Sequence, residues 1–213
     1  MKNMITELVF ILDRSGSMGG LESDTIGGFN SMIEKQKKEE GLTNVTTVLF
    51  DNNFEIVHNR VPIENTLPMT QETYYVRGCT ALLDAVGETV NHVAKTQKYL
   101  RPGDRADKVI TVIITDGLEN ASRRYSRGEV KKMIELEKEK YGWEFIFLGA
   151  NIDAAGEAGS IGIDDDRAVD YRNDSAGVKL NYDVVCETIT RMRSSEKRVD
   201  GSWKKKIEED KDR

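Results

Sequence analysis

The chain has 213 residues, of which 38% are hydrophobic and 32% are charged, and its formal net charge is −6 at pH 7. This length suits one domain with a substantial buried core. The acidic balance argues against a nucleic-acid-binding protein, because the one basic run, at 204–206, is followed at once by acidic residues.

Cysteine content and apolar runs bear on the expected compartment. Cys79 and Cys186 are too few for a disulfide framework, so we expect two thiols, with Cys79 as a small buried residue. The first apolar run, 8–12, is too short for a signal peptide, and no run approaches the ~20 apolar residues of a membrane span. We therefore expect a cytoplasmic protein that does not associate with membranes.

Strand and helix patterns alternate along the chain. In chain order they predict a strand at 8–12, a helix at 21–39, strands at 45–50 and 54–61, a helix at 80–99, a strand at 109–114, a helix at 129–141, a strand at 143–148, a short helix at 153–159, a strand at 168–171 and a helix at 175–192. We expect Ser175 to cap the last helix. Residues 1–193 form the predicted domain, and 194–213 read as a frayed, charged C-terminal tail with Trp203 as its one anchor.

This order predicts an α/β fold, a doubly wound and mostly parallel six-stranded sheet with helices on both faces. The short turn at 51–53 requires a hairpin, so the strand at 54–61 is the one antiparallel edge strand. Ligands of such sheets bind beyond the carboxyl ends of the strands, where the strand order reverses. Two acidic turns, at Asp13 and Asp116, are expected to flank that point.

The segment Asp13-Arg14-Ser15-Gly16-Ser17 places a carboxylate and two hydroxyls at alternate positions after a buried strand. Residues at i, i+2 and i+4 of an extended segment point the same way, so these three oxygen donors can converge. Oxygen donors are the ligands that a hard cation such as Mg²⁺ prefers. The alternative is structural, since Ser15 and Ser17 can also bind turn amides or cap a helix.

Two further segments complete a pattern that resembles the von Willebrand factor A (vWA) family. Gly78-Cys79-Thr80-Ala81-Leu82 opens the helix at 80–99, and Thr115-Asp116-Gly117 follows the strand at 109–114. The resemblance covers about residues 5–192. It implies a metal-ion-dependent adhesion site (MIDAS) that binds Mg²⁺, or Mn²⁺ or Ca²⁺, through five ligands: Asp13, Ser15, Ser17, Thr80 and Asp116. Each piece alone has a simpler reading, Thr80 as a helix cap and Asp116 as a turn residue.

Several neighbours of these motifs are predicted to lie on the same edge of the sheet: Tyr74, Tyr75, Arg77, Glu119, Asn120, Asn151 and Asp153. Tyr74, Tyr75 and Arg77 could form a recognition rim, since aromatic residues and Arg are enriched at binding hot spots, and Glu119 and Asn120 could line it. The alternative is that the tyrosines pack the loop and that Glu119 is plain surface. His58 and His92 are far apart in sequence, and we expect packing or surface roles for both.

The predicted function is a protein-binding module, not an enzyme, in which the bound cation docks an acidic residue of a partner protein. No phosphate-binding loop, nucleophile elbow or zinc motif accompanies the site. One alternative is a Mg²⁺-dependent phosphohydrolase with Asp13 as nucleophile, but Ser15 stands where such enzymes carry an acid/base carboxylate. Another, by family analogy, is a regulatory partner of an ATPase or of a stress or tellurite-resistance system. The sequence makes no prediction of the oligomeric state.

Overall fold

The computed structural model describes residues 4–195 and 198–212. It contains a six-stranded sheet in the order β3-β2-β1-β4-β5-β6. Its strands are β1 (Ile5–Asp13), β2 (Leu42–Phe50), β3 (Phe54–Pro62), β4 (Lys108–Thr115), β5 (Glu144–Ala150) and β6 (Ala168–Tyr171). β3 pairs antiparallel with β2, whereas the other neighbouring strands pair parallel. The predicted fold class is therefore confirmed, including the antiparallel edge strand.

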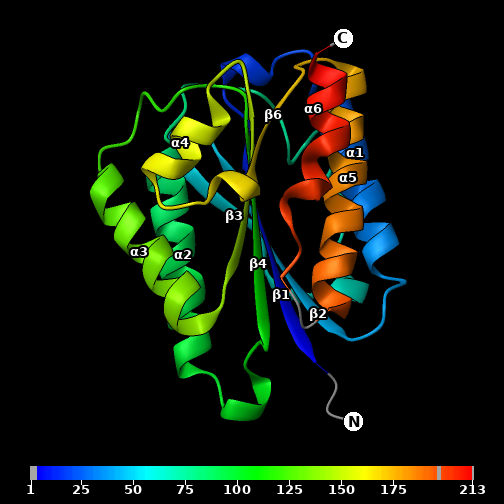
Figure 1. The fold of residues 1–213 in the computed structure, drawn as a ribbon, viewed down its shortest axis with the longest axis vertical. Coiled ribbons are helices and arrows are strands. Elements are labelled where there is room, and N and C mark those ends of the chain that lie inside the picture. Colours follow the sequence, from blue (N-terminus) through cyan, green and yellow to red (C-terminus); the bar gives the residue numbers. More distant parts are fainter. Residues whose placement is uncertain (1–3, 196–197, 213) are drawn as a thin grey trace.

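Helices cover both faces of the sheet (Figure 1). They are α1 (Glu22–Gln36), α2 (Leu82–Tyr99), α3 (Arg127–Tyr141), α4 (Ala154–Ser160), α5 (Ser175–Ser194) and α6 (Lys205–Lys211). α1, α5 and α6 lie on one face, and α2, α3 and α4 lie on the other. Within the described residues, no helix combines the length and the apolar character needed to span a membrane.

β1 shows why the strands are apolar throughout. Leu8, Phe10 and Leu12 join the core on the α1/α5 side, whereas Val9 and Ile11 join the core on the α2/α3 side. Successive side chains of a strand point to opposite faces, and both faces here are covered by helices. The central strand is therefore apolar from Leu8 to Leu12, and Asp13 ends it at the carboxyl end of the sheet.

The start of α5 corrects one prediction. Asp174, not Ser175, is the N-cap residue, and its carboxylate accepts a hydrogen bond from the amide of Gly177 at 2.8 Å. Ser175 is the first helical residue, and its hydroxyl donates to Asp24 of α1 at 2.6 Å. Asp and Ser are comparable N-caps, so the sequence pattern alone did not separate these adjacent positions.

The C-terminal segment also differs from the prediction, since Gly201–Lys211 is folded and not frayed. Trp203 and Ile207 are each only 2% exposed, because an i, i+4 pair on a helical segment shares one face and here covers the edge of the sheet. The Trp203 indole also donates to the main-chain oxygen of Asp166 at 2.8 Å. Residues 196–197 and 213 of the predicted tail lie outside the described residues, and the domain division at 193 stays a prediction.

Candidate metal site

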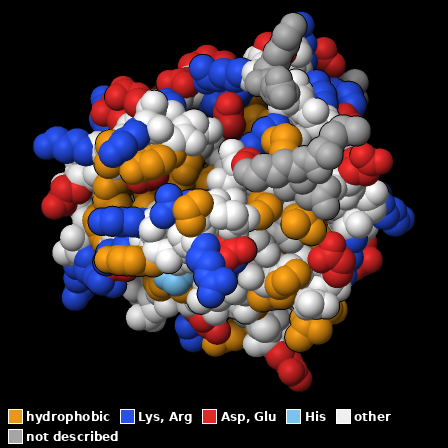
Figure 2. All heavy atoms as spheres, turned by 90° about the horizontal axis from the view of Figure 1, so that it is seen from below, with side chains coloured by type: hydrophobic (Ala, Val, Ile, Leu, Met, Phe, Trp, Pro, Cys, Tyr) orange, Lys and Arg blue, Asp and Glu red, His pale blue; other side chains and the backbone are white. Residues whose placement is uncertain are grey.

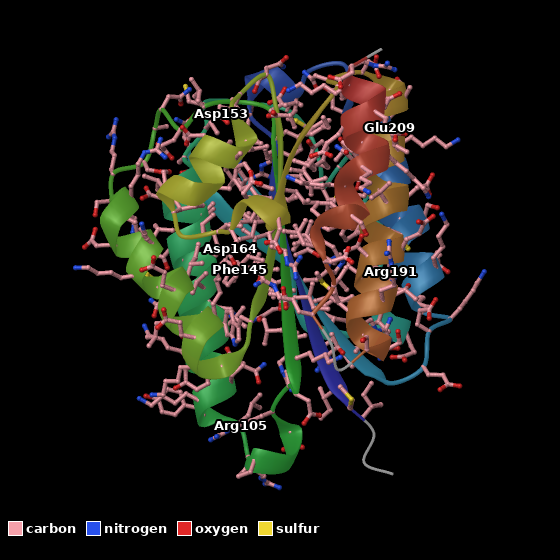
Figure 3. The ribbon with its side chains drawn as sticks, in the orientation of Figure 1. Arg105, Phe145, Asp153, Asp164, Arg191 and Glu209 are labelled. Atoms are coloured by element: carbon pink, nitrogen blue, oxygen red, sulfur yellow. The ribbon has the colours of Figure 1, made fainter. Side chains whose placement is uncertain are left out.

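Three segments meet at the carboxyl end of the sheet. Asp13 ends β1, Asp116 follows the end of β4, and Thr80 lies two residues before α2. β1 and β4 are hydrogen-bonded neighbours, and they lie at the point where the strand order reverses. Figure 3 labels Asp153, which follows β5, near this same end. The topology therefore brings the predicted ligands together at the predicted switch point.

The three predicted hydroxyl ligands form a chain. The Thr80 hydroxyl donates to Ser15 Oγ at 3.0 Å, and Ser15 Oγ lies 3.0 Å from Ser17 Oγ. Thr80 and Ser15 are buried whereas Ser17 is exposed, so the chain runs from the interior to the surface. A Cβ atom at Gly117 would lie 3.2 Å from Thr80 Oγ1 and 3.3 Å from Ser17 Oγ, which places the Asp116–Gly117 backbone against the same hydroxyls.

Asp13 is held by donors on both carboxylate oxygens. Its Oδ1 accepts from the amide of Ser15 at 2.7 Å, and its Oδ2 accepts from the Thr115 hydroxyl at 2.7 Å. Burial raises the pKa of Asp13 to about 6, although these hydrogen bonds lower it in part. The carboxylate is thus fixed in orientation, but its ionisation is unfavourable unless a positive charge lies nearby.

Asp116 is satisfied on one oxygen only. Its Oδ2 accepts from the side-chain amide of Asn173 at 3.2 Å, and its Oδ1 is buried with no hydrogen-bond partner. Burial also raises the pKa of this carboxyl, and the side chains of Ser17 and Asn173 offset this only in part. A buried carboxylate oxygen without a partner carries an uncompensated desolvation cost. A divalent cation is the kind of group that would remove that cost.

The residues at this edge fit a hard cation. They offer two carboxylates and three hydroxyls, all of them oxygen donors, beside the unpartnered Oδ1 of Asp116. Within the described residues, no group of three or more His, Cys, Asp or Glu gathers as a metal-binding cluster. Cation binding at this edge would therefore depend on the hydroxyls of Ser15, Ser17 and Thr80.

Sequence reasoning missed Arg14, which lies inside the signature segment and is wholly buried. Its Nε donates to Asp51 at 2.9 Å, and its Nη2 lies 2.7 Å from a carboxylate oxygen of Glu55. Arg77 also binds Asp51, at 2.7 Å, and its amide donates to the main-chain oxygen of Arg14 at 2.9 Å. Asp51 follows β2 at the same end of the sheet. Its position directly after a predicted strand is the sequence feature that could have placed it near Arg14.

In the loop before Thr80, one tyrosine is buried and the other is exposed. Tyr74 is buried, and its hydroxyl donates to the main-chain oxygen of Asp13 at 2.6 Å, which confirms the packing alternative for this tyrosine. Tyr75 is 43% exposed, and the guanidinium groups of Arg14 and Arg77 lie 5.3 and 5.1 Å from its ring centre. Of the three rim candidates in this loop, Tyr75 and Arg77 are exposed and Tyr74 is not.

Glu119 and Asn120 hold the start of α2. Glu119 accepts hydrogen bonds from the amide of Leu83 at 2.8 Å and from the hydroxyl of Ser122 at 2.7 Å, so it caps the helix and is not plain surface. Asn120 accepts from the amide of Thr80 at 3.0 Å. Asn120 therefore positions Thr80, and Glu119 holds the first turn of α2 that follows it, roles that the sequence pattern did not indicate.

Cys79 corrects another prediction because its side chain is exposed, not buried. Gly78 takes a left-handed conformation with φ of 69°, and the amide of Cys79 donates to the side chain of Asn52 at 2.9 Å. This geometry fixes the Cys79 backbone in the loop and leaves the thiol at the surface. Cys186 is buried, and both cysteines are free thiols.

The other predicted positions lie as follows. Asn151 is exposed with φ of 56°, and Asp153 caps α4 by accepting from the amide of Gly156. His58 is buried and stacks on Phe29, so it has a packing role. His92 Nε2 lies 2.8 Å from Asn59 Oδ1.

Comparison with known proteins yields structural neighbours only. No family model matches the sequence, and no curated protein matches it. A structure titled von Willebrand factor type A from Catenulispora acidiphila matches 88% of the chain with a TM-score of 0.56 and 12% identity, and the match covers 43% of that protein. The chain has the vWA fold.

Two other neighbours share this vWA fold. The vWF domain of the type V pili tip protein Mfa5 from Porphyromonas gingivalis matches 92% of the chain and 99% of its own length, with a TM-score of 0.63 and 11% identity. Proximal thread matrix protein 1 from the mussel byssus, with a zinc-occupied MIDAS motif, matches 88% of the chain with a TM-score of 0.59 and 13% identity. The chain spans 46% of that byssus protein.

Proposed function

We propose that the chain is a cation-dependent protein-binding module. A divalent cation, Mg²⁺ by the chemistry of the oxygen donors, binds at Asp13, Ser15, Ser17, Thr80 and Asp116. An acidic side chain of a partner protein then completes the coordination shell. The unpartnered Oδ1 of Asp116, beside three linked hydroxyls, is the observation that carries this proposal.

The surroundings support an acidic partner. Ser17 at the outer end of the hydroxyl chain is exposed, so a group from another protein can reach the proposed cation. The Arg77 side chain is 43% exposed and lies against Tyr75, so hydrogen-bond donors and an aromatic surface border the same loops, while Asp51 balances the charge of Arg77. The zinc-occupied MIDAS motif of the byssus protein supports divalent-cation binding on this fold.

The geometry favours binding over phosphoryl transfer. Ser15 is tied to Thr80 and Ser17 and has no carboxyl group for acid/base catalysis. We therefore propose that the site docks a ligand without turning it over.

Calorimetric titration with Mn²⁺ and Mg²⁺ tests the cation site. We expect saturable binding by the wild-type protein and none by Asp116→Ala. The matched control is Asp104→Ala, because Asp104 is exposed in the turn Pro102–Asp104, at the opposite end of the sheet. Equal binding by wild type and Asp116→Ala would refute the assignment.

A pull-down with and without EDTA tests the docking role. Partner proteins that depend on the cation should be lost with EDTA and with Asp116→Ala, and kept with Asp104→Ala. A partner that is retained in every condition would show that this protein binds without its cation.

A further inference from the structure

A cavity of about 330 Å³ lies at the other end of the molecule. It is formed by the C-terminal parts of α2 and α3, by residues 105–107 and Val109 at the start of β4, and by Trp143 just before β5. Figure 3 labels Arg105 of its wall at this end, far from Asp153 at the metal-bearing end. Its volume is at the lower end of the range for small-molecule sites, about 300–1,000 Å³.

The lining of the cavity is largely apolar. Val109 and Trp143 are 4% and 5% exposed and form its floor, next to Ala94. Leu136 and Tyr141 also line it, yet they are 52% and 57% exposed. The view from below in Figure 2 shows hydrophobic side chains interspersed with Lys and Arg at this end. Large apolar side chains that are exposed next to one another often mark a site that binds a ligand or a partner.

Glu137 of α3 lines this cavity and is only 7% exposed. Among the described residues, none donates a hydrogen bond to its carboxyl group, whereas its main-chain oxygen accepts from Gly142 and Trp143. Burial raises the pKa of Glu137, and the charge of Lys140 offsets this only in part. The Glu137 oxygens are not among the buried unpartnered atoms of the described residues, so they reach solvent in the cavity. An N–H group entering the cavity would therefore find a charge-assisted acceptor there.

The facing wall carries the opposite charge. Lys95 and Lys98 of α2 and Arg105 of the following turn line the cavity across from α3. Arg105 donates to the main-chain oxygens of Leu100 and Lys98, which holds its guanidinium at the wall. The acidic residue of this wall, Asp107, accepts from the amide of Ile5. The cavity thus separates a negative group on one wall from positive groups on the other.

We propose that this cavity binds a free hydrophobic amino acid. Its ammonium group donates to Glu137, its carboxylate faces Lys98 and Arg105, and its apolar side chain packs on Trp143. A zwitterion with an apolar body is the small molecule that matches all three features at once. This site is separate from the metal site, so a test that refutes one proposal leaves the other standing.

Three probes dissect the recognition. L-phenylalanine has all three groups, phenethylamine lacks the carboxylate, and 3-phenylpropionate lacks the ammonium. Binding is measured by calorimetry and by the ¹⁵N–¹H signals of the tryptophan indoles in NMR spectra. The chain has two tryptophans, and Trp203 is buried beside α6, so its signal is a built-in control. We expect L-phenylalanine to shift the Trp143 signal only.

Two variants test the charged walls. Glu137→Gln is expected to weaken L-phenylalanine and phenethylamine about tenfold and to leave 3-phenylpropionate unchanged. Lys98→Gln with Arg105→Gln is expected to weaken L-phenylalanine and 3-phenylpropionate instead. The control is Glu135→Gln, on the same helix with a side chain 43% exposed. Failure of all probes to shift Trp143, or equal affinities of wild type and Glu137→Gln, would overturn the proposal.

Discussion

The two carboxylates of the candidate metal site differ in how the protein satisfies them. Asp13 receives hydrogen bonds on both oxygens, whereas Asp116 receives one from Asn173 and keeps one buried oxygen without a partner. Asp13 is therefore oriented before any cation arrives. Asp116 gains most from a cation, because its unpaired oxygen then acquires a partner.

The raised pKa of Asp13 predicts a pH effect on the cation-free protein. Its pKa rises from 3.8 to about 6, so folding disfavours the ionised form. The contribution of Asp13 to stability is complete below about pH 4 and is lost as the pH rises through 6, by about 3 kcal/mol. Urea unfolding at pH 4.5 and 7 in EDTA should show about 2 kcal/mol of this loss, and Asp13→Asn should remove this part of the pH dependence.

The same pKa predicts that protons compete with the cation. Below about pH 6 Asp13 is protonated, so Mn²⁺ affinity should fall with decreasing pH, approaching tenfold per unit if one proton is displaced. Calorimetry at pH 5, 6 and 7 measures this dependence. An affinity that does not change over this range would show that Asp13 does not bind the cation as a carboxylate.

A residue outside the three signature segments, Asn173, is expected to affect cation binding. Its side-chain amide holds Oδ2 of Asp116 at 3.2 Å, so Asn173→Ala should free the carboxylate and weaken Mn²⁺ binding about tenfold. Asn65→Ala is the control, because Asn65 is exposed in the turn Ile63–Asn65. If the two variants bind Mn²⁺ equally well, Asn173 does not position Asp116.

Between elements, the contact of α1 with α5 depends on a glycine. A Cβ atom at Gly28 would lie 2.3 Å from Cδ2 of Tyr182, whose ring is buried, whereas a Cβ atom at Gly27 meets nothing within 4 Å. The helices can therefore pack closely only because Gly28 has no side chain.

Alanine at these two neighbouring glycines gives a matched pair. Gly27→Ala should stabilise the protein by about 0.5–1 kcal/mol, because alanine favours helix. Gly28→Ala should destabilise it by about 1–3 kcal/mol through overpacking against Tyr182. Urea unfolding measures both values, and equal effects of the two changes would contradict the close contact.

The C-terminal helix α6 is held mainly by Trp203 and Ile207, which are each 2% exposed. Trp203→Ala should lower the free energy of unfolding by about 3–5 kcal/mol, because it leaves a cavity and an unpaired oxygen at Asp166. Thermal unfolding measures the loss, with Tyr99→Ala as the control because Tyr99 is 81% exposed. Similar stability of the two variants would indicate that the C-terminal segment is frayed, as expected from the sequence.

At the scale of the molecule, periodicity and turn chemistry predicted the element order and the antiparallel edge, because covered strands must be apolar on both faces. The signature segments likewise placed Asp13, Thr80 and Asp116 at one edge. Arg14 and Asn173 escaped prediction because their roles depend on partners distant in sequence, Asp51 and Asp116 respectively. The fold of 201–211 escaped because two apolar residues were too few to reveal a buried face among charged ones.

Cation binding should stabilise the whole fold, because the proposed ligands come from segments that are joined only in the native state. At a cation concentration one hundred times the dissociation constant, the gain in unfolding free energy is about 2.7 kcal/mol. Thermal unfolding with and without Mn²⁺ measures the gain, which Asp116→Ala should abolish. Equal gains in both proteins would indicate cation binding elsewhere.

The two ends of the described chain lie at opposite ends of the molecule. The strand β1 starts at the lower end in Figure 1, whereas α6 runs toward the upper end, where the candidate metal site lies. A sensor surface, resin or fluorescent fusion attached before β1 therefore leaves the metal-bearing loops facing solution. The same attachment after α6 crowds those loops, so binding assays should use immobilisation through the N-terminal side.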